Sequence, residues 1–294
     1  MSRRERELRE GALSDEELGA EAEEQATNIS EEEEVEVEER RAPPAKVVHE
    51  VIRRQGIEEL ERPAASLLWS GLVAGVAIGM SILAEAILKL RLPESPAKEF
   101  LVGIGYTVGF VIVILGRLQL FTESTITAVL PLATKPSWAS LGRTARLWVL
   151  VLAANMAGTF AFALFAHIGG FGGAEMQNAI VEVSKVIPEH DAWATFLTGI
   201  PSGFLLAVIV WLMPSSSGQR VWIIMLLTGL IVWGGFAHVV AGSCEAWVLV
   251  IAGTVSLPWA IGSFLFPALI GNVVGGTALF TFLAHAQVHR EIHR

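Results

Sequence analysis

The chain has 294 residues, of which 52% are hydrophobic and 17% are charged, and its mean hydropathy is +0.53. This is too apolar for one soluble domain of this length, because the apolar residues come in long blocks. Cys244 is the only cysteine, which excludes an intramolecular disulfide and a cysteine-based metal site. The sequence shows no phosphate loop, metal-ligand spacing or catalytic triad. It therefore predicts a protein that is not an enzyme and that needs no cofactor and no nucleic acid.

The start of the chain is strongly acidic. Residues 1–40 carry 16 acidic and 5 basic side chains, a net charge of −11, so the remaining chain is net +2. The run SEEEEVEVEE (30–39) has too little apolar surface to fold, which predicts a disordered cytoplasmic tail over 1–45. No apolar stretch follows Met1, so we expect no cleaved signal peptide. The next residues, AKVVHEVIRRQGIEELERP, predict an amphipathic cytoplasmic helix over 46–62 that lies on the inner membrane surface.

Six apolar segments follow, and about 20 apolar residues are enough to cross a bilayer as a helix. The segments are 66–88, 101–133, 145–168, 192–213, 222–252 and 258–286. They predict an all-α integral membrane protein with six transmembrane helices in a domain over 63–289, followed by a short cytoplasmic tail over 290–294. The second and fifth segments exceed thirty residues, and the polar or small residues inside them predict that both helices are interrupted.

Lysine and arginine predict the orientation, because cytoplasmic loops carry the excess of these residues. With six crossings, the side that holds both termini carries nine basic residues, whereas the opposite connections carry four. Both termini are therefore expected in the cytoplasm. Residues 169–191 then form an external connection, in which 174–187 have helical spacing.

The two halves of the domain look related. NMAGTFAFALFAH in the third segment and NVVGGTALFTFLAH in the sixth align Asn155 with Asn272, an offset of 117 residues. The same offset pairs Phe121 in the first break with His238 in the second. Three spans followed by three have opposite orientations in the membrane, so the pattern predicts a 3+3 inverted repeat. Interrupted helices at equivalent positions of such a repeat indicate a substrate site near the midplane.

The two breaks hold the candidate functional residues. Broken helices are tolerated in a membrane only against protein or a watery pathway. The first break, LQLFTES, supplies the hydroxyl of Thr122 and backbone amides that would attract an anion. The second break, FAHVVAGS, places His238 at the matching depth. Ionisable residues inside membranes are usually functional, so we expect His238 to lie on a transport pathway.

Other polar residues in these segments are expected to have structural roles. Arg117 and Glu123 flank the first break and are expected to neutralise one another. Glu85 lies near the external end of the first span, where it can reach the membrane interface. Asn155 and Asn272 are expected to form hydrogen bonds between packed helices.

With these motifs the chain resembles the formate/nitrite transporter family over about residues 46–289. The resemblance rests on LFTES, GIPSGFLLAVIVW, GFAHVVAG and PALIGNVVGG. It implies an aquaporin-like fold in a bacterial inner membrane and a homopentamer in which each protomer has its own pore. It also implies passage of a small monovalent anion such as formate or nitrite, with protons. By the same resemblance Leu120, Phe121 and Thr122 line the first broken loop, His238 is the central pore histidine, and Tyr106 and Phe110 form pore constrictions.

Several positions depart from the family pattern. Gly203 stands in the fourth span where the family commonly has asparagine. The acidic residue expected before Leu-Phe-Thr is Gln119, and Glu123 stands directly after the threonine instead. The family's glutamate and asparagine that flank the histidine are replaced by Ala237 and Gly242. These departures leave the substrate open, and we include Glu123 and Gly203 among the candidate pathway residues.

The sequence therefore predicts a transmembrane channel or proton-coupled transporter for a small monovalent anion or its weak acid. One alternative is a channel for neutral small solutes, although the paired Asn-Pro-Ala signatures of such channels are absent. A second alternative is a membrane scaffold or sensor that keeps the fold without transport and signals through 1–45.

Overall fold

The computed structural model describes residues 30–292, and the chain separates into two compact units, 1–42 and 43–294. Within the first unit, the described residues contain the helix α3 (Glu31–Arg40). This corrects the expectation of disorder over 30–39, whereas residues 1–29 lie outside the described part. Ser30 and Glu33 form a capping box, because the Glu33 amide donates to Ser30 Oγ and the Glu33 carboxylate accepts from the Ser30 amide. We missed this S-x-x-E signature in the sequence.

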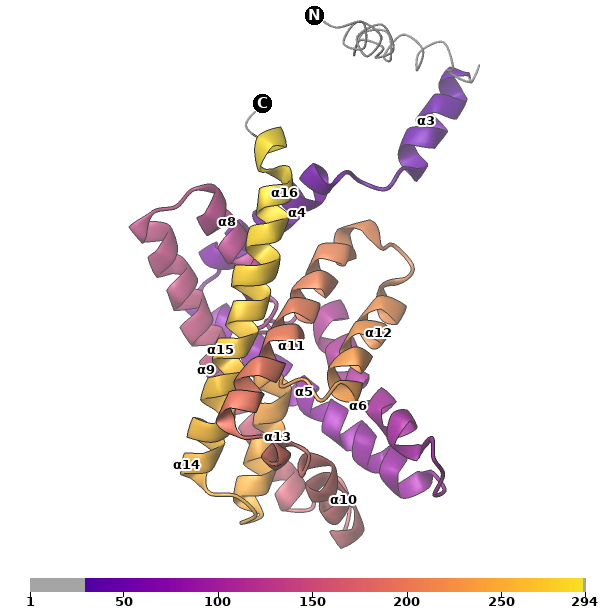
Figure 1. The fold of residues 1–294 in the computed structure, drawn as a ribbon, viewed down its shortest axis with the longest axis vertical. Helices are drawn as coiled ribbons and strands as arrows, with labels where there is room; N and C mark the ends of the chain where they lie inside the picture. Colours follow the sequence, from indigo (N-terminus) through magenta and orange to yellow (C-terminus); the bar gives the residue numbers. More distant parts are fainter. Residues whose placement is uncertain (1–29, 293–294) are drawn as a thin grey trace, which may run out of the picture. The chain divides into compact units, whose positions relative to one another are not determined.

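The second unit, 43–294, is the membrane domain, and its described regular elements are all helical (Figure 1). The long helices are α4 (Ala45–Glu61), α5 (Ala64–Arg91), α6 (Lys98–Leu115), α9 (Trp138–His167), α10 (Ala174–Ser184), α11 (Ala192–Leu212), α12 (Arg220–Trp233) and α13 (Val239–Ile251). The chain ends in a continuous helical rod made of α14 (Leu257–Trp259), α15 (Phe266–Val273) and α16 (Phe282–Ile292), joined by the π-helical stretches Ala260–Leu265 and Val274–Thr281. The helix predicted over 174–187 is α10.

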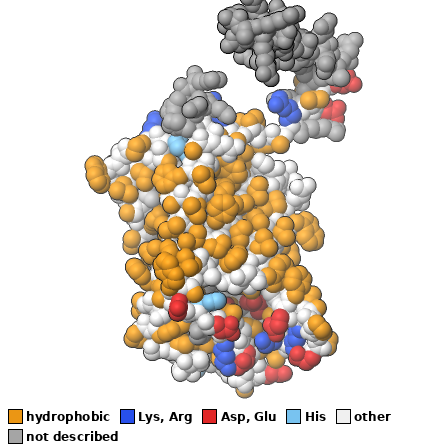
Figure 2. Space-filling model, viewed as in Figure 1, with side chains coloured by type: hydrophobic (Ala, Val, Ile, Leu, Met, Phe, Trp, Pro, Cys, Tyr) orange, Lys and Arg blue, Asp and Glu red, His pale blue; other side chains and the backbone are white. Residues whose placement is uncertain are grey.

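Five helices of the described part are long and apolar enough to cross a membrane. They are α5, α6, α9, α11 with its short 3₁₀ extension, and the terminal rod over Leu257–Val288. The visible face of the domain carries a broad band of apolar side chains, with charged side chains gathered near its lower end in the view (Figure 2). Large side chains such as Trp138 and Trp222 are 88% and 72% exposed. Such a surface is stable against lipid, which agrees with an integral membrane protein.

Two of the six predicted spans, the second and the fifth, are interrupted. In the second, α6 ends at Leu115, and the chain resumes helical structure in α7 (Ser124–Thr127) and α8 (Val129–Thr134). In the fifth, α12 ends at Trp233 and α13 begins at Val239. Both interruptions lie where polar and small residues in the sequence predict them.

Each break begins with the same backbone geometry. Gly116 and Gly234 cap the preceding helices, and the next residue has a left-handed conformation, with φ of 51° at Arg117 and 63° at Gly235. A residue in this conformation stops a helix. At the second break glycine adopts it without steric cost, whereas at the first break an arginine adopts it.

The helix α4 packs on the domain through one face, and its location at the inner membrane surface stays a prediction. Its buried residues are Val48, His49, Ile52, Gly56 and Leu60, and it contacts α7, α8, α11 and α16. Val47, expected on the apolar stripe, is 48% exposed. A Cβ atom at Gly56 would lie 1.8 Å from the Thr127 carbonyl oxygen, so glycine is required where α4 meets α7.

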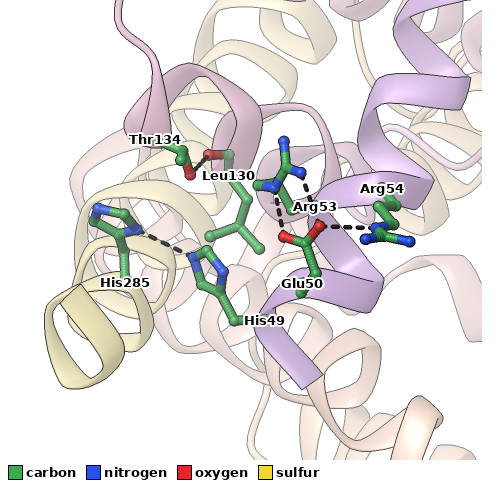
Figure 3. A network of polar contacts seen from close by, with 7 residues as sticks. All are labelled: His49, Glu50, Arg53, Arg54, Leu130, Thr134 and His285. Carbon is green, nitrogen blue, oxygen red and sulfur yellow. Dashed lines mark hydrogen bonds and ion pairs between the residues drawn. The ribbon is translucent and has the colours of Figure 1, made fainter. Parts of the chain in front are cut away.

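Two histidines join α4 to α16. His49 Nε2 lies 3.1 Å from His285 Nδ1, beside the pairing of Glu50 with Arg53 and Arg54 (Figure 3). His49 is fully buried, and its Nδ1 atom has no hydrogen-bond partner. Burial lowers the pKa of His49 from 6.5 to about 4, and the charge of His285 contributes in the same direction.

The neutral state of His49 makes the stability of the domain depend on pH. The unfolded chain binds a proton near pH 6.5, whereas the folded chain binds it only near pH 4, so stability should fall as the pH falls through this window. We expect thermal unfolding in detergent to show that the free energy of unfolding falls by about 1–2 kcal/mol as the pH is lowered through this window. In the His49→Gln variant this fall should be absent. Parallel pH profiles for the wild type and this variant would contradict the assignment.

Candidate transport pathway

Asn155 of α9 holds the first break in place. Its Oδ1 atom accepts a hydrogen bond from the Phe121 amide at 2.9 Å. Its Nδ2 atom donates to the carbonyl oxygens of Gly71, at 2.8 Å, and Gln119, at 2.9 Å. One fully buried side chain therefore pairs two backbone groups that the break leaves without helical partners and fixes them to α5.

Asn272 of α15 holds the second break by the same pattern. Its Oδ1 atom accepts from the Val239 amide at 2.8 Å, and its Nδ2 atom donates to the carbonyl oxygens of Gly199 and Ala237, both at 2.8 Å. The expected role of the two asparagines was helix packing. The structure adds a role in pairing the backbone of the breaks, which the repeated asparagine alone did not reveal.

These contacts correct the alignment of the two breaks by one residue. The offset between the asparagines is 117, but the backbone groups that they bind, Phe121 and Val239, are 118 apart. Arg117 and Gly235, the left-handed residues, are also 118 apart. His238 therefore corresponds to Leu120, and the predicted pairing with Phe121 was wrong. The two breaks are equivalent in backbone, but the first carries the apolar Leu120 where the second carries the ionisable His238.

Five predicted pathway residues meet between the breaks, and we call them the central cluster: Phe110, Leu120, Phe121, Thr122 and His238. His238 Nε2 lies 2.9 Å from Thr122 Oγ1, and the Phe110 ring meets the histidine edge-on with a centroid distance of 5.0 Å. All five side chains are at most 2% exposed. The central cluster is therefore closed to solvent, with one polar contact, between Thr122 and His238.

The hydrogen bonds of His238 define a neutral ring. His238 caps the start of α13, and its Nδ1 atom accepts a bond from the Ala241 amide at 3.1 Å. An imidazole that accepts at Nδ1 carries its proton at Nε2, which can donate to Thr122 Oγ1. A second proton on the ring would break the cap bond. The capping contact therefore favours the neutral ring, provided that no anion is nearby.

A cavity of about 420 Å³ opens on the α4 side of the central cluster. Leu120, Gln119 and Glu123 line it together with Glu59 of α4. The Thr127 hydroxyl donates to the Glu59 carboxylate at 2.6 Å, and burial raises the pKa of Glu59. This cavity is the inner cavity, named for the predicted cytoplasmic location of α4.

The predicted pairing of Arg117 with Glu123 is not formed. Arg117 is exposed, and no ion pair joins it to Glu123 within residues 30–292. The Glu123 Oε1 atom is buried without a hydrogen-bond partner, and the charge that it meets is the carboxylate of Glu59. The left-handed backbone at Arg117 directs the chain away from the geometry that the sequence spacing suggested.

A second cavity, of about 60 Å³, lies on the other side of the central cluster. Tyr106 and His238 line it, together with Glu245 of α13 and His190 from the connection after α10. We call it the outer cavity. The inner and outer cavities share no lining residue, and Leu120 and His238 stand on opposite sides of the closed constriction.

Gly203 lies in the contact between α11 and α15. A Cβ atom there would lie 2.1 Å from the Asn272 carbonyl oxygen, and Gly203 lines neither cavity. Its absence of a side chain lets α11 approach the asparagine that holds the second break. An asparagine at this position, as in the family pattern, does not fit this helix contact.

A methyl group at Gly203 should therefore disturb the second break. We expect Gly203→Ala to lower the free energy of unfolding by about 1–3 kcal/mol, the range of overpacked cores. Thermal unfolding of the purified protein measures the change. Gly142→Ala is the matched control, because a Cβ atom at Gly142 of α9 meets no atom within 4 Å. Equal melting temperatures for both variants would show that the α11–α15 contact accommodates the added methyl group without a loss of stability.

The chain matches the sequence profile of a known protein family. The profile described as "Formate/nitrite transporter" matches residues 46–286, which span nearly the whole membrane domain. The chain belongs to this family.

The family includes relatives that match most of the chain. The inner membrane protein YfdC of Escherichia coli (strain K12) is 40% identical over 260 residues, which cover 88% of this chain and 84% of that protein. A solved FNT family ion channel superposes with a TM-score of 0.70 at 19% identity and covers 83% of this chain and 98% of its own. A pentameric formate channel with formate bound gives a TM-score of 0.63 at 20% identity, with coverage of 77% and 98%. The two structural likenesses show the fold.

Family membership confirms the resemblance found in the sequence. It also confirms the general prediction of a transmembrane channel or transporter for small anions. The roles of individual residues, including the central cluster and Glu123, remain predictions.

Proposed function

We propose that the membrane domain carries a small monovalent anion, or its weak acid, such as formate or nitrite, across a bacterial inner membrane. The observation that carries this proposal is the contact between His238 and Thr122, which closes the constriction between two separate cavities. A pathway through this point has apolar walls and one polar pair. That composition suits a small anion that takes up a proton and passes as the neutral acid.

The chemistry of the constriction supports a neutral permeating species. A bare anion that enters an apolar constriction loses hydration worth several kcal/mol, even after relaxation of the protein. The Nε2–H of His238 can turn from Thr122 to an anionic oxygen. A nearby anion also stabilises a charged ring, which offsets the loss of the bond from Ala241. The histidine then shares its proton with the anion, and the neutral acid crosses Leu120 and Phe121.

The same proposal includes six crossings in a 3+3 inverted repeat with an aquaporin-like fold. The asparagines that bind the two breaks by the same pattern support it. The fifth crossing, which brings the number to six, would be made jointly by α12 and α13, each too short to span alone. We further propose that the exposed apolar surface faces lipid and neighbouring subunits of a homopentamer, as the solved pentameric formate channel suggests. The basic residues near both termini favour their cytoplasmic location.

Flux into liposomes that contain the full-length protein tests this proposal. Formate, nitrite and acetate should enter faster than in empty liposomes, and entry should increase as the outside is acidified. A neutral solute such as glycerol should show no such increase. Glycerol flux that equals formate flux would favour a neutral-solute channel. A wild-type protein that passes none of these compounds would favour the scaffold or sensor, in which removal of 1–42 abolishes signalling.

A further inference from the structure

Two buried carboxyl groups stand close together at the α10 end of the domain. Glu85 of α5 and Glu245 of α13 are each 7% exposed. The helices α5 and α13 are packed together, and Ile82 and Ala86 beside Glu85 share one apolar cluster with Cys244 and Val248 beside Glu245, so the two carboxyl groups belong to the same helix contact. Within residues 30–292, no ion pair includes either carboxylate. The central cluster does not use this pair, and the sequence predicted only that Glu85 reaches the membrane interface.

The pair has access to the predicted transport pathway. Glu245 lines the outer cavity together with His238 and Tyr106. His238, Gly242 and Glu245 follow one another at helical spacing, so they lie along one face of α13. A carboxyl group therefore stands two turns from the histidine, on the same wall of the cavity.

The charged groups around the pair do not neutralise it. Lys89 of α5 is the basic residue that acts on Glu85, but it is engaged by Glu99 of α6 at 3.8 Å. Tyr106 of α6 and Cys244 of α13 also face the carboxylates, and His190 lies on the opposite side of the outer cavity. On α10, which packs against both helices, Glu182 and Lys185 pair with one another. No arginine or lysine lines the outer cavity.

Two carboxylates in such surroundings cannot both hold a negative charge at neutral pH. Nearby like charges in a poorly hydrated site keep one proton between them, and the two groups then titrate as a pair. Intramembrane carboxyl groups of this kind mark proton pathways in transport proteins.

We propose that Glu85 and Glu245 hold one shared proton and deliver it to a weak-acid anion in the outer cavity. This inference rests on the proposed transport function. The O–H bond of Glu245 breaks and an O–H bond forms on the substrate, so the neutral acid moves on to Thr122 and His238. The carboxylate pair then takes up a proton from water on the α10 side. The pathway consequently selects anions basic enough to accept a proton, such as formate or acetate, and rejects anions of strong acids such as nitrate.

Infrared difference spectroscopy of the full-length protein in liposomes tests the shared proton without any substrate. We expect the carbonyl stretch of a protonated carboxylic acid at neutral pH, which disappears at high pH. Glu245→Gln and Glu85→Gln should each remove or shift this band, whereas Glu182→Gln on the exposed face of α10 should leave it unchanged. A wild-type spectrum without a protonated acid at neutral pH overturns the inference, as does a spectrum that neither replacement changes, because Glu85 and Glu245 should account for part of the band even where the buried Glu59 and Glu123 contribute the rest.

Flux measurements test the delivery of the proton. Glu245→Gln should reduce the entry of formate and acetate at least tenfold and flatten its dependence on the outside pH, with normal assembly by gel filtration. Unchanged flux in this variant, or nitrate entry as fast as formate entry in the wild type, overturns the inference alone. Absence of all weak-acid flux in the wild type overturns the proposed function instead, and the infrared result still decides whether the proton is shared.

Discussion

Replacement of His238 by asparagine is expected to leave a folded protein that transports poorly. Asparagine is among the best N-cap residues, so its side-chain oxygen can accept the bond from the Ala241 amide that starts α13. Its amide ends short of the Nε2 position that contacts Thr122, and it cannot hold a positive charge. Loss of a hydrogen bond to a charged partner costs about 1.5–3 kcal/mol, which corresponds to a roughly 10- to 100-fold lower flux. We further expect the increase of flux in acid to be lost.

The measurement is formate flux into liposomes between pH 5 and 8, normalised to assembled protein. His167→Asn is the matched control, because this histidine lies exposed at the end of α9 and outside both cavities. A packing role for His238 makes the opposite prediction, with poor assembly and normal flux for each surviving channel. Normal assembly together with an unchanged pH profile would remove His238 from the mechanism.

The membrane helices and their two breaks could be predicted from the sequence because both have local causes. A span needs a long apolar run, and a break needs small or polar residues within one. The ends of α6 and α12 illustrate this, since a glycine caps each helix directly before the break. The capping box at Ser30 was equally local and readable. The prediction of disorder there relied on the acidic composition and not on this capping signature.

The contacts within the site could not be predicted in the same way, because they depend on the register of distant helices. The asparagine offset of 117 suggested a partner for His238 that the backbone offset of 118 corrects. Likewise, the spacing of Arg117 and Glu123 suggested an ion pair. The left-handed turn at Arg117 and the approach of α4 brought Glu59 to Glu123 instead. A single sequence gives no signal for α4 covering this cavity.

The relation between Glu85 and Glu245 could not be predicted from the sequence either. The sequence places them in separate spans, 160 residues apart, with no motif that connects them. Only the packing of α5 against α13 brings the two carboxyl groups together. The outer cavity therefore carries one carboxyl group, that of Glu245, which the family pattern around the histidine did not predict.

Replacement of either asparagine that holds a break should have the largest effect on the fold. Leucine is close to asparagine in size but offers no hydrogen bond. Asn272→Leu leaves the Val239 amide and the Ala237 carbonyl without their partner, together with the Gly199 carbonyl. Each buried backbone group left unpaired costs about 1–3 kcal/mol, so for three groups we expect a loss of roughly 3–9 kcal/mol. The variant should therefore yield little or no assembled protein.

The two breaks are held by the same contacts, so Asn155→Leu should be as damaging as Asn272→Leu. Fluorescence-detected gel filtration of membrane extracts measures the assembled fraction for both. Asn178→Leu on the exposed side of α10 controls for the loss of an amide and should assemble like the wild type. If Asn155→Leu and Asn272→Leu both assemble normally, water or lipid must pair the freed backbone groups, and the asparagines are not needed to hold the breaks. If only one of them fails to assemble, the two halves share a backbone pattern without sharing its energetic role.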